Sequence, residues 1–167
     1  SVAYVLQQGN FQAVIFKAGA SFDSLGTYFL FRCLLRSWTD LEAVAAAIAV
    51  ISVPVAAAFV IEHATRRNLF AFFGGVNEIT WERDGKLRCQ GAFAHAILAG
   101  CFWAAQMPLF VAKWFRGGTS RVGCAVGLLC SSVIIAACAS STPVMAIGLA
   151  AAGFALFPFR RYMRAVR

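Results

Sequence analysis

Charged residues are scarce in this sequence. Only 13% of the 167 residues are Asp, Glu, Lys or Arg and 60% are hydrophobic, whereas a soluble domain carries about 25% charged residues. Residues 41–61 contain a single charge, on Glu42, and residues 90–112 contain no acidic residue, Lys or Arg. Such a chain has too little polar surface to cover a globule in water. The composition therefore excludes a soluble domain and indicates a membrane protein.

The sequence also lacks the patterns of metal sites, disulfide frameworks and secretion signals. Its 6 cysteines form no CxxC or Cys/His spacing and mostly lie in apolar runs, which predicts packing residues and no metal or cofactor. The first 12 residues hold no basic segment followed by an apolar one, and no initiator Met, so we expect a central fragment of a longer chain. The net charge of +8 does not indicate nucleic acid, because the basic residues cluster beside apolar runs.

The apolar runs predict an all-α fold, a polytopic bundle of about four to five transmembrane helices in a single domain over residues 1–167. A span needs roughly 20 apolar residues. The expected spans are a short one at 24–38 and longer ones at 43–61, 92–115, 122–139 and 143–159. Residues 1–23 are expected to form a loop with one short strand or helix, because Gly9, Asn10 and Gly19 interrupt them.

Five residues predict how these helices start, bend and pack. Thr39 or Asp40 should cap the second span, because their side chains accept the free amide hydrogens of a first helical turn. Pro54 predicts a bend inside that span. Gly123 and Gly127 have the GxxxG spacing that lets a second helix backbone approach closely.

Residues 62–91 form the main polar interruption, which we expect to be a loop outside the bundle. Within it, alternating residues flank Asp84 and Gly85, the dipeptide favoured in two-residue hairpin turns. The sequence therefore predicts a small β-hairpin in this loop.

The basic residues predict which side of the membrane each loop faces. No acidic residue follows Asp84, and the turn at 140–142 carries no charge. Because cytoplasmic loops carry an excess of Lys and Arg, residues 113–121 and 160–167 should be cytoplasmic and the 62–91 loop should be periplasmic. The basic residues that support this orientation are Lys113, Arg116, Arg121, Arg160, Arg161, Arg164 and Arg167.

Candidate binding residues gather where the outer loop meets the next span, in RCQGAFAHAILAG, residues 88–100. Arg88 could hold a phosphate through two parallel donors, Gly91 would let a backbone approach, and His95 follows within about two helical turns. The alternative is structural: an interfacial Arg is more often an anchor, and an interfacial His more often a satisfied polar residue.

Arg32 and Arg36 lie one helical turn apart in the first, short apolar segment. A lone charge at the centre of a bilayer costs about 3 kcal/mol on insertion scales, so each guanidinium needs water, a phosphate or a partner. We expect Arg36 to reach the cytoplasmic interface and Arg32 to face the interior of the bundle.

The order of these features resembles the bacterial O-antigen ligase and O-antigen polymerase family. An arginine-bearing helix, FDSLGTYFLFRCLLRSWTDLE, is followed by a span and then by an outer loop that closes in RCQGAFAHAILAG. Family members often show Arg-x-x-Gly-x-Phe-x-His/Asn-Pro at this junction. Arg88, Gly91, Phe93 and His95 match that pattern, and Ala96 stands where it usually has Pro. The resemblance covers roughly residues 20–115.

The resemblance implies a glycosyltransferase of the bacterial inner membrane that acts in lipopolysaccharide biosynthesis. Such an enzyme moves glycan from an undecaprenyl-pyrophosphate carrier to an acceptor glycan or lipid A core, without nucleotide sugar, metal or cofactor. The resemblance assigns Arg88 to the carrier diphosphate, with Arg83 and Lys86 as weaker helpers and Gly91, His95 and Arg32 as further substrate-binding residues. The candidate base lies further along the family's chains, so the catalytic residues here are unknown.

Two distinctions stay open at this point. The first is between ligase and polymerase. The second is between an enzyme and a non-catalytic membrane module, either a piece of a transporter or a structural helix bundle. A transporter should show paired halves with polar groups at mid-membrane. The sequence shows no internal repeat, and Arg32 is nearly alone as an ionisable residue inside a span.

Overall fold

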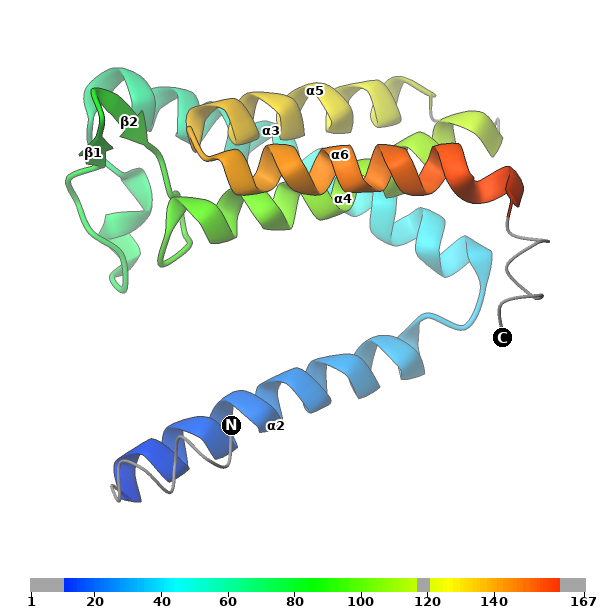
Figure 1. Ribbon diagram of the computed structural model, residues 1–167, viewed down its shortest axis with the longest axis horizontal. Helices are drawn as coiled ribbons and strands as arrows, with labels where there is room; N and C mark the ends of the chain where they lie inside the picture. Colours follow the sequence, from blue (N-terminus) through cyan, green and yellow to red (C-terminus); the bar gives the residue numbers. More distant parts are fainter. Residues whose placement is uncertain (1–10, 117–120, 160–167) are drawn as a thin grey trace. The chain divides into compact units, whose positions relative to one another are not determined.

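The computed structural model describes residues 11–116 and 121–159, which are mostly helical (Figure 1). This confirms the all-α fold, and the strands among the described residues form one two-stranded sheet. By its contacts the chain divides into two compact units, Ser1–Ala43 and Val44–Arg167. The helices are α2 (Phe11–Leu34), α3 (Trp38–Thr65), α4 (Ala96–Arg116), α5 (Arg121–Ala137) and α6 (Ser141–Leu156).

The first unit is built on α2, which has 24 residues and begins far earlier than the expected span at 24–38. The helix runs through Gly19, where we expected an interruption. A single glycine costs a helix only about 1 kcal/mol, so a flanking apolar sequence can carry the helix through it. Every residue from Val14 to Leu34 is exposed, including Phe16 and Phe22.

The start of α3 is fixed by a capping box rather than by a cap at Thr39 or Asp40. Ser37 Oγ accepts the Asp40 amide at 3.2 Å, and Asp40 Oδ2 accepts the Ser37 amide at 2.9 Å. Asp40 Oδ2 also accepts the Arg36 amide at 3.0 Å. Reciprocal bonds of this kind satisfy free donors of a first turn, so the helix begins at Trp38. Ser37 is therefore the cap, and Asp40 supports it from the third helical position.

One stripe of α3 is buried within the second unit. The helix contains Pro54, and a bend there stays a prediction. Because the buried positions recur every three or four residues, they lie on one face. This face consists of Ala45, Ala49, Ser52, Ala56, Phe59 and Glu62. The helix continues to Thr65, so Glu62 belongs to α3 and not to the outer loop that we expected to begin there.

Helices α4, α5 and α6 pack together because glycines let them approach. α4 contacts both α5 and α6. A Cβ atom on Gly127 of α5 would lie 2.7 Å from the Phe110 ring of α4, and one on Gly100 of α4 would overlap Pro143 of α6. Gly127 therefore makes the close helix contact expected of it. Apart from Pro143, no residue of α6 is buried in the described structure.

Three helices are long and apolar enough to cross a bilayer: α3, α4, and α6 with its extension to Phe159. α5 has only 17 residues, about 26 Å at 1.5 Å per residue, which is slightly shorter than a hydrocarbon core of about 30 Å. The chain is a membrane protein. Residues 117–120 lie outside the described residues, as do four of the basic residues, Arg160, Arg161, Arg164 and Arg167.

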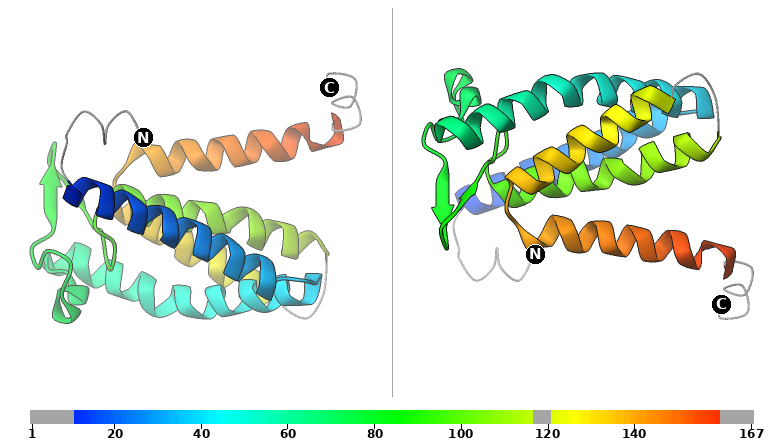
Figure 2. Two further views of the ribbon diagram at one scale, coloured as in Figure 1. Left: turned by 90° about the horizontal axis from the view of Figure 1, so that it is seen from below. Right: turned by 90° about the horizontal axis from the view of Figure 1, so that it is seen from above.

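The best packed part of the second unit lies at the end that carries the hairpin (Figures 1 and 2). The Cys89 amide donates to the Ala137 carbonyl at 3.1 Å, so the outer loop and the turn between α5 and α6 meet at this end. The core there consists of Ala56, Phe59, Cys89, Ala96, Ala99, Trp103, Ala104, Ile134, Ile135 and Cys138.

Candidate functional site

The outer loop contains the expected hairpin, formed by β1 (Trp81–Arg83) and β2 (Lys86–Arg88). Its turn residues Asp84 and Gly85 have φ values of 54° and 72°. Positive φ at both central positions is the geometry that favours Asp-Gly, because it matches the twist of the strands. The hairpin prediction is confirmed.

The strand register decides which side chains of the hairpin lie together. Trp81 pairs with Arg88 and Arg83 pairs with Lys86 in the antiparallel ladder. Side chains of directly paired residues lie on the same face of a sheet, as do those two residues apart on one strand. Trp81, Arg83, Lys86 and Arg88 therefore share one face. Of these, Trp81, Arg83 and Arg88 line the same pocket.

The remainder of the outer loop folds back on itself before the hairpin. The Asn68 amide donates to the Glu78 carbonyl at 2.8 Å, and the Thr80 amide to the Arg66 carbonyl at 3.0 Å. Between these closures lies the short 3-10 helix η1 (Leu69–Phe73), which Asn68 caps by accepting the Phe70 amide at 3.0 Å. Hydrogen bonds therefore hold together the two ends of the segment that precedes the hairpin.

Glu62 holds the chain that follows the hairpin. Its carboxylate is 1% exposed. Oε1 accepts the Gln90 amide at 3.1 Å and the Thr80 hydroxyl at 3.0 Å, and Oε2 accepts the Gly91 amide at 3.0 Å. A buried carboxylate needs several donors of this kind to offset its lost hydration. One acidic side chain of α3 therefore fixes both ends of the segment that carries Arg88.

Gly91 is fixed on its carbonyl side as well, and no other residue fits there. The Asn68 side chain donates to the Gly91 carbonyl at 2.7 Å. The φ of Gly91 is 55°, and a Cβ atom would overlap the ring of Phe59. The space beside Gly91 is filled by the side chain of Phe59 and not by a backbone segment. Its contact with a substrate stays a prediction.

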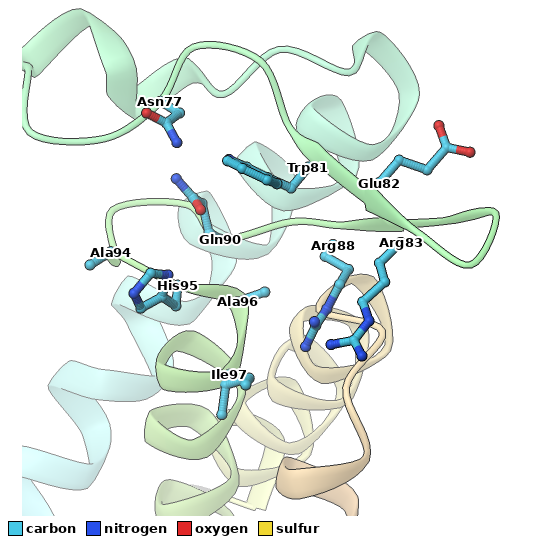
Figure 3. Close-up of a pocket in the computed structure, with 10 residues that line it drawn as sticks. All are labelled: Asn77, Trp81, Glu82, Arg83, Arg88, Gln90, Ala94, His95, Ala96 and Ile97. Atoms are coloured by element: carbon cyan, nitrogen blue, oxygen red, sulfur yellow. The ribbon is translucent and has the colours of Figure 1, made fainter.

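A pocket of about 410 Å³ opens between the hairpin and the start of α4 (Figure 3). Three of the residues predicted from the sequence line it: Arg83, Arg88 and His95. They also lie close together in the sequence. The carbonyl of His95 accepts the amides of Leu98 and Ala99 in the first turn of α4. The complete lining is Asn77, Trp81, Glu82, Arg83, Arg88, Gln90, Ala94, His95, Ala96 and Ile97.

Two predicted residues lie elsewhere. Lys86 lines a second hollow of about 360 Å³, together with His63, Arg66 and Ala136 among others. Arg32 belongs to α2 in the first unit, where its guanidinium donates to the Tyr28 hydroxyl at 3.2 Å. The assignment of Arg32 to the site, and its position in the bundle interior, stay predictions.

Arg88 is the cation of the pocket whose charge is least matched. The side chain is half-buried, and its Nε is buried with no hydrogen-bond partner. Other cations of the loop have acidic partners: Arg83 lies 3.6 Å from Asp84, and Arg66 lies 3.5 Å from Glu82. Among the described residues, no carboxylate forms a salt bridge with Arg88. A buried donor without a partner is costly, so an anion in the pocket would satisfy it.

Cys89 lies beside Arg88 in the chain but does not provide a nucleophile. The thiol is fully buried, and His63 Nδ1 lies 3.9 Å from its sulfur. Burial raises the pKa of the Cys89 thiol to about 12, and the negative charge of Glu62 adds to this effect. The reactive form of cysteine is the thiolate. At neutral pH the thiol is protonated and unreactive.

No group of His, Cys, Asp and Glu in the described parts of the chain is arranged to hold a metal ion. The pocket itself offers the guanidinium groups of Arg83 and Arg88, the imidazole of His95, the indole of Trp81 and the amide of Gln90.

Sequence reasoning missed Glu62 because its charge was taken as the start of the polar loop. The spacing of the small residues in the second span offers the missing signal. Ala49, Ser52, Ala56 and Phe59 follow one another at three or four residues, and the next step of three reaches Glu62. A carboxylate on the buried stripe of an apolar helix needs donors, which predicts a structural or functional role.

Comparisons with protein-family models, with curated proteins and with solved structures found no match to this chain.

Proposed function

We propose that the pocket holds the diphosphate of an undecaprenyl-pyrophosphate-linked glycan and that the protein is a membrane glycosyltransferase of the O-antigen ligase or polymerase type. The observation that carries this proposal is the half-buried Arg88, whose Nε has no partner and which lines a pocket at one end of apolar helices. A guanidinium is always charged and offers a planar pair of donors, which suits phosphate oxygens.

The place of the pocket supports a lipid-linked substrate. The pocket lies at the start of α4, one of the helices that could cross a bilayer. The end of a membrane-spanning helix lies at the level of the lipid headgroups. A diphosphate attached to a membrane-embedded polyprenyl chain lies at the same level. The charge distribution favours the periplasmic face of a bacterial inner membrane for this end, because the basic residues gather beyond the opposite ends of α4 and α6.

Transfer from such a donor needs little from the protein beyond charge and positioning. The bond between the anomeric carbon and the diphosphate oxygen breaks, and a hydroxyl oxygen of the acceptor glycan or lipid A core forms the new bond. Negative charge grows on the leaving diphosphate, where Arg88 would stabilise it, assisted by Arg83. The acceptor proton passes to a base that is not assigned to a residue.

The test is glycan transfer from purified lipid carrier by the full-length protein, with the membrane abundance of each variant measured in parallel. Arg88→Ala should lower kcat/KM roughly 100-fold, the usual cost of removing one donor to a developing charge. Arg88→Lys keeps the charge but loses the paired donors, and a drop of about tenfold or more is expected.

Arg83→Lys is the matched control, because Arg83 is an exposed hairpin residue that already lies beside Asp84. Its effect on transfer should be far milder. Near-normal transfer by both Arg88 variants would reduce Arg88 to an interfacial anchor and would favour a non-catalytic membrane module.

A further inference from the structure

The pocket has two chemically different sides (Figure 3). Arg83 and Arg88 extend side by side from the hairpin and form a cationic side. Trp81, Asn77 and Gln90 form the other side, which is aromatic and amide-bearing and carries no charge. A diphosphate explains the first side. Binding of a diphosphate does not explain the second side, which carries no positive charge.

Trp81 presents a large aromatic surface to the pocket without being packed in the core. Its side chain is 66% exposed although tryptophan is usually well buried. In the ladder it is paired directly with Arg88, so a ligand held by Arg88 lies next to the indole. Flat aromatic faces beside a few polar groups are typical of small-molecule sites, and the C–H face of a pyranose ring packs on such a surface.

The two amides supply the polar groups that such a ligand needs. Figure 3 shows the side-chain amides of Asn77 and Gln90 directed toward one another beside the Trp81 ring. Each amide offers two donors and one acceptor oxygen, which suits the hydroxyls of a sugar. Gln90 is only 6% exposed, and Glu62 accepts its backbone amide at 3.1 Å, so the backbone that carries this side chain is fixed before any ligand arrives.

We propose that the side formed by Trp81, Asn77 and Gln90 binds the first sugar of the lipid-linked glycan, the sugar bonded to the diphosphate. This inference rests on the proposed function and names the ligand of the uncharged side of the same pocket. The pocket of about 410 Å³ lies within the range of sites for ligands of this size. The protein would thus recognise the glycan at the sugar whose bond to the diphosphate is broken.

The experiment compares two probes on the full-length protein in lipid nanodiscs. One is bare undecaprenyl pyrophosphate, and the other is the same carrier with the glycan extracted from the cells that make the protein. Trp81→Ala should raise the Kd for the glycan-bearing carrier about tenfold, the usual contribution of an aromatic face. It should leave the Kd for the bare carrier unchanged, and Trp81→Phe should restore most of the affinity.

Phe73→Ala is the control for a general effect of exposed aromatic residues. Phe73 lies in the same loop, is 83% exposed and does not line the pocket. Its removal should change neither Kd. An equal loss for both carriers in Trp81→Ala, or the same loss in Phe73→Ala, would overturn the sugar site and make Trp81 an interfacial anchor.

The outcomes also separate this inference from the proposed function. Arg88→Ala should weaken both carriers, because both contain the diphosphate. If Arg88→Ala changes neither Kd, the proposed function fails whatever Trp81 does. If Arg88→Ala weakens both and Trp81→Ala weakens neither, only the sugar site fails. Lack of binding of either carrier to the unaltered protein overturns both proposals.

Discussion

At the scale of single residues, the site depends on a carboxylate that never enters the pocket. Glu62 does not line it, yet three hydrogen bonds from Glu62 hold Thr80 and the amides of Gln90 and Gly91. Arg88 and Trp81 lie between these fixed points. The positions of the pocket's cation and aromatic ring are therefore set from α3, beneath the loop.

Glu62→Gln should destabilise the folded protein by about 2–4 kcal/mol, because an amide nitrogen would face a backbone donor where a carboxylate oxygen accepted it. Thermal unfolding in detergent measures the effect. Glu78→Gln is the control: Glu78 is exposed and pairs with Arg67 at 3.5 Å on the surface, and surface pairs contribute at most about 1 kcal/mol. Equal melting temperatures for the two variants would contradict the role assigned to Glu62.

The residues of the outer loop show which contacts a sequence can predict and which it cannot. The Asp84–Gly85 turn was predictable because two positive φ values favour that dipeptide strongly and locally. Arg83 and Arg88 lie together because the hairpin brings nearby positions together, and His95 joins them in the pocket lining from just before α4. The role of Glu62 was not predictable, because its partners lie 18 to 29 residues further along the chain. A charged residue at the end of an apolar run is read as the start of a loop. Whether it is buried depends on contacts with residues distant in the sequence, which the local pattern does not show.

At the scale of helices, hydrogen bonds of side chains decide where α3 and α4 begin, whereas the apolar composition decides that their middle parts are helical. α3 begins at Trp38 because of the Ser37–Asp40 capping box, five residues before the expected span. α4 begins at Ala96 rather than at 92, because bonds to Glu62 and Asn68 hold the preceding segment outside the helix. The apolar interiors were predictable, since any span must be apolar throughout.

The contact between α4 and α5 gives a prediction at this scale. Gly127→Ala would place a methyl group 2.7 Å from the Phe110 ring, closer than packed atoms allow, so the helices must separate and stability should fall by about 1–3 kcal/mol. Gly148→Ala in α6 is the control, because nothing lies within 4 Å of the added Cβ and alanine favours a helix by about 1 kcal/mol.

Thermal unfolding of both variants, together with Phe110→Leu and the double variant Gly127→Ala/Phe110→Leu, makes the test specific. A smaller ring should relieve part of the clash, so the double variant should be more stable than the sum of the single changes predicts. Strict additivity, or a loss in Gly148→Ala equal to that in Gly127→Ala, would show that the Gly127 contact does not limit helix packing.

At the scale of the whole molecule, the described structure places the outer loop and the α5–α6 turn at one end of the second unit. Both should therefore face the same side of the membrane. Single cysteines at Asn77 and Ser120, in a background without native cysteines, test this orientation with an impermeant thiol reagent on spheroplasts. Labelling is expected at 77 and not at 120, because the basic residues lie toward the second position. Labelling at 120 alone would invert the topology.

The hydrogen bond from the Cys89 amide to the Ala137 carbonyl also sets an order of assembly. Ala137 is made 48 residues after Cys89, and at 5–20 residues per second this delay is roughly 2–10 seconds. During that time the outer loop lacks its last backbone partner and the cover of Ile134, Ile135 and Cys138. The packing around Cys89 is thus completed only when α5 arrives, so a nascent chain that stops after α4 presents an unfinished loop to proteases.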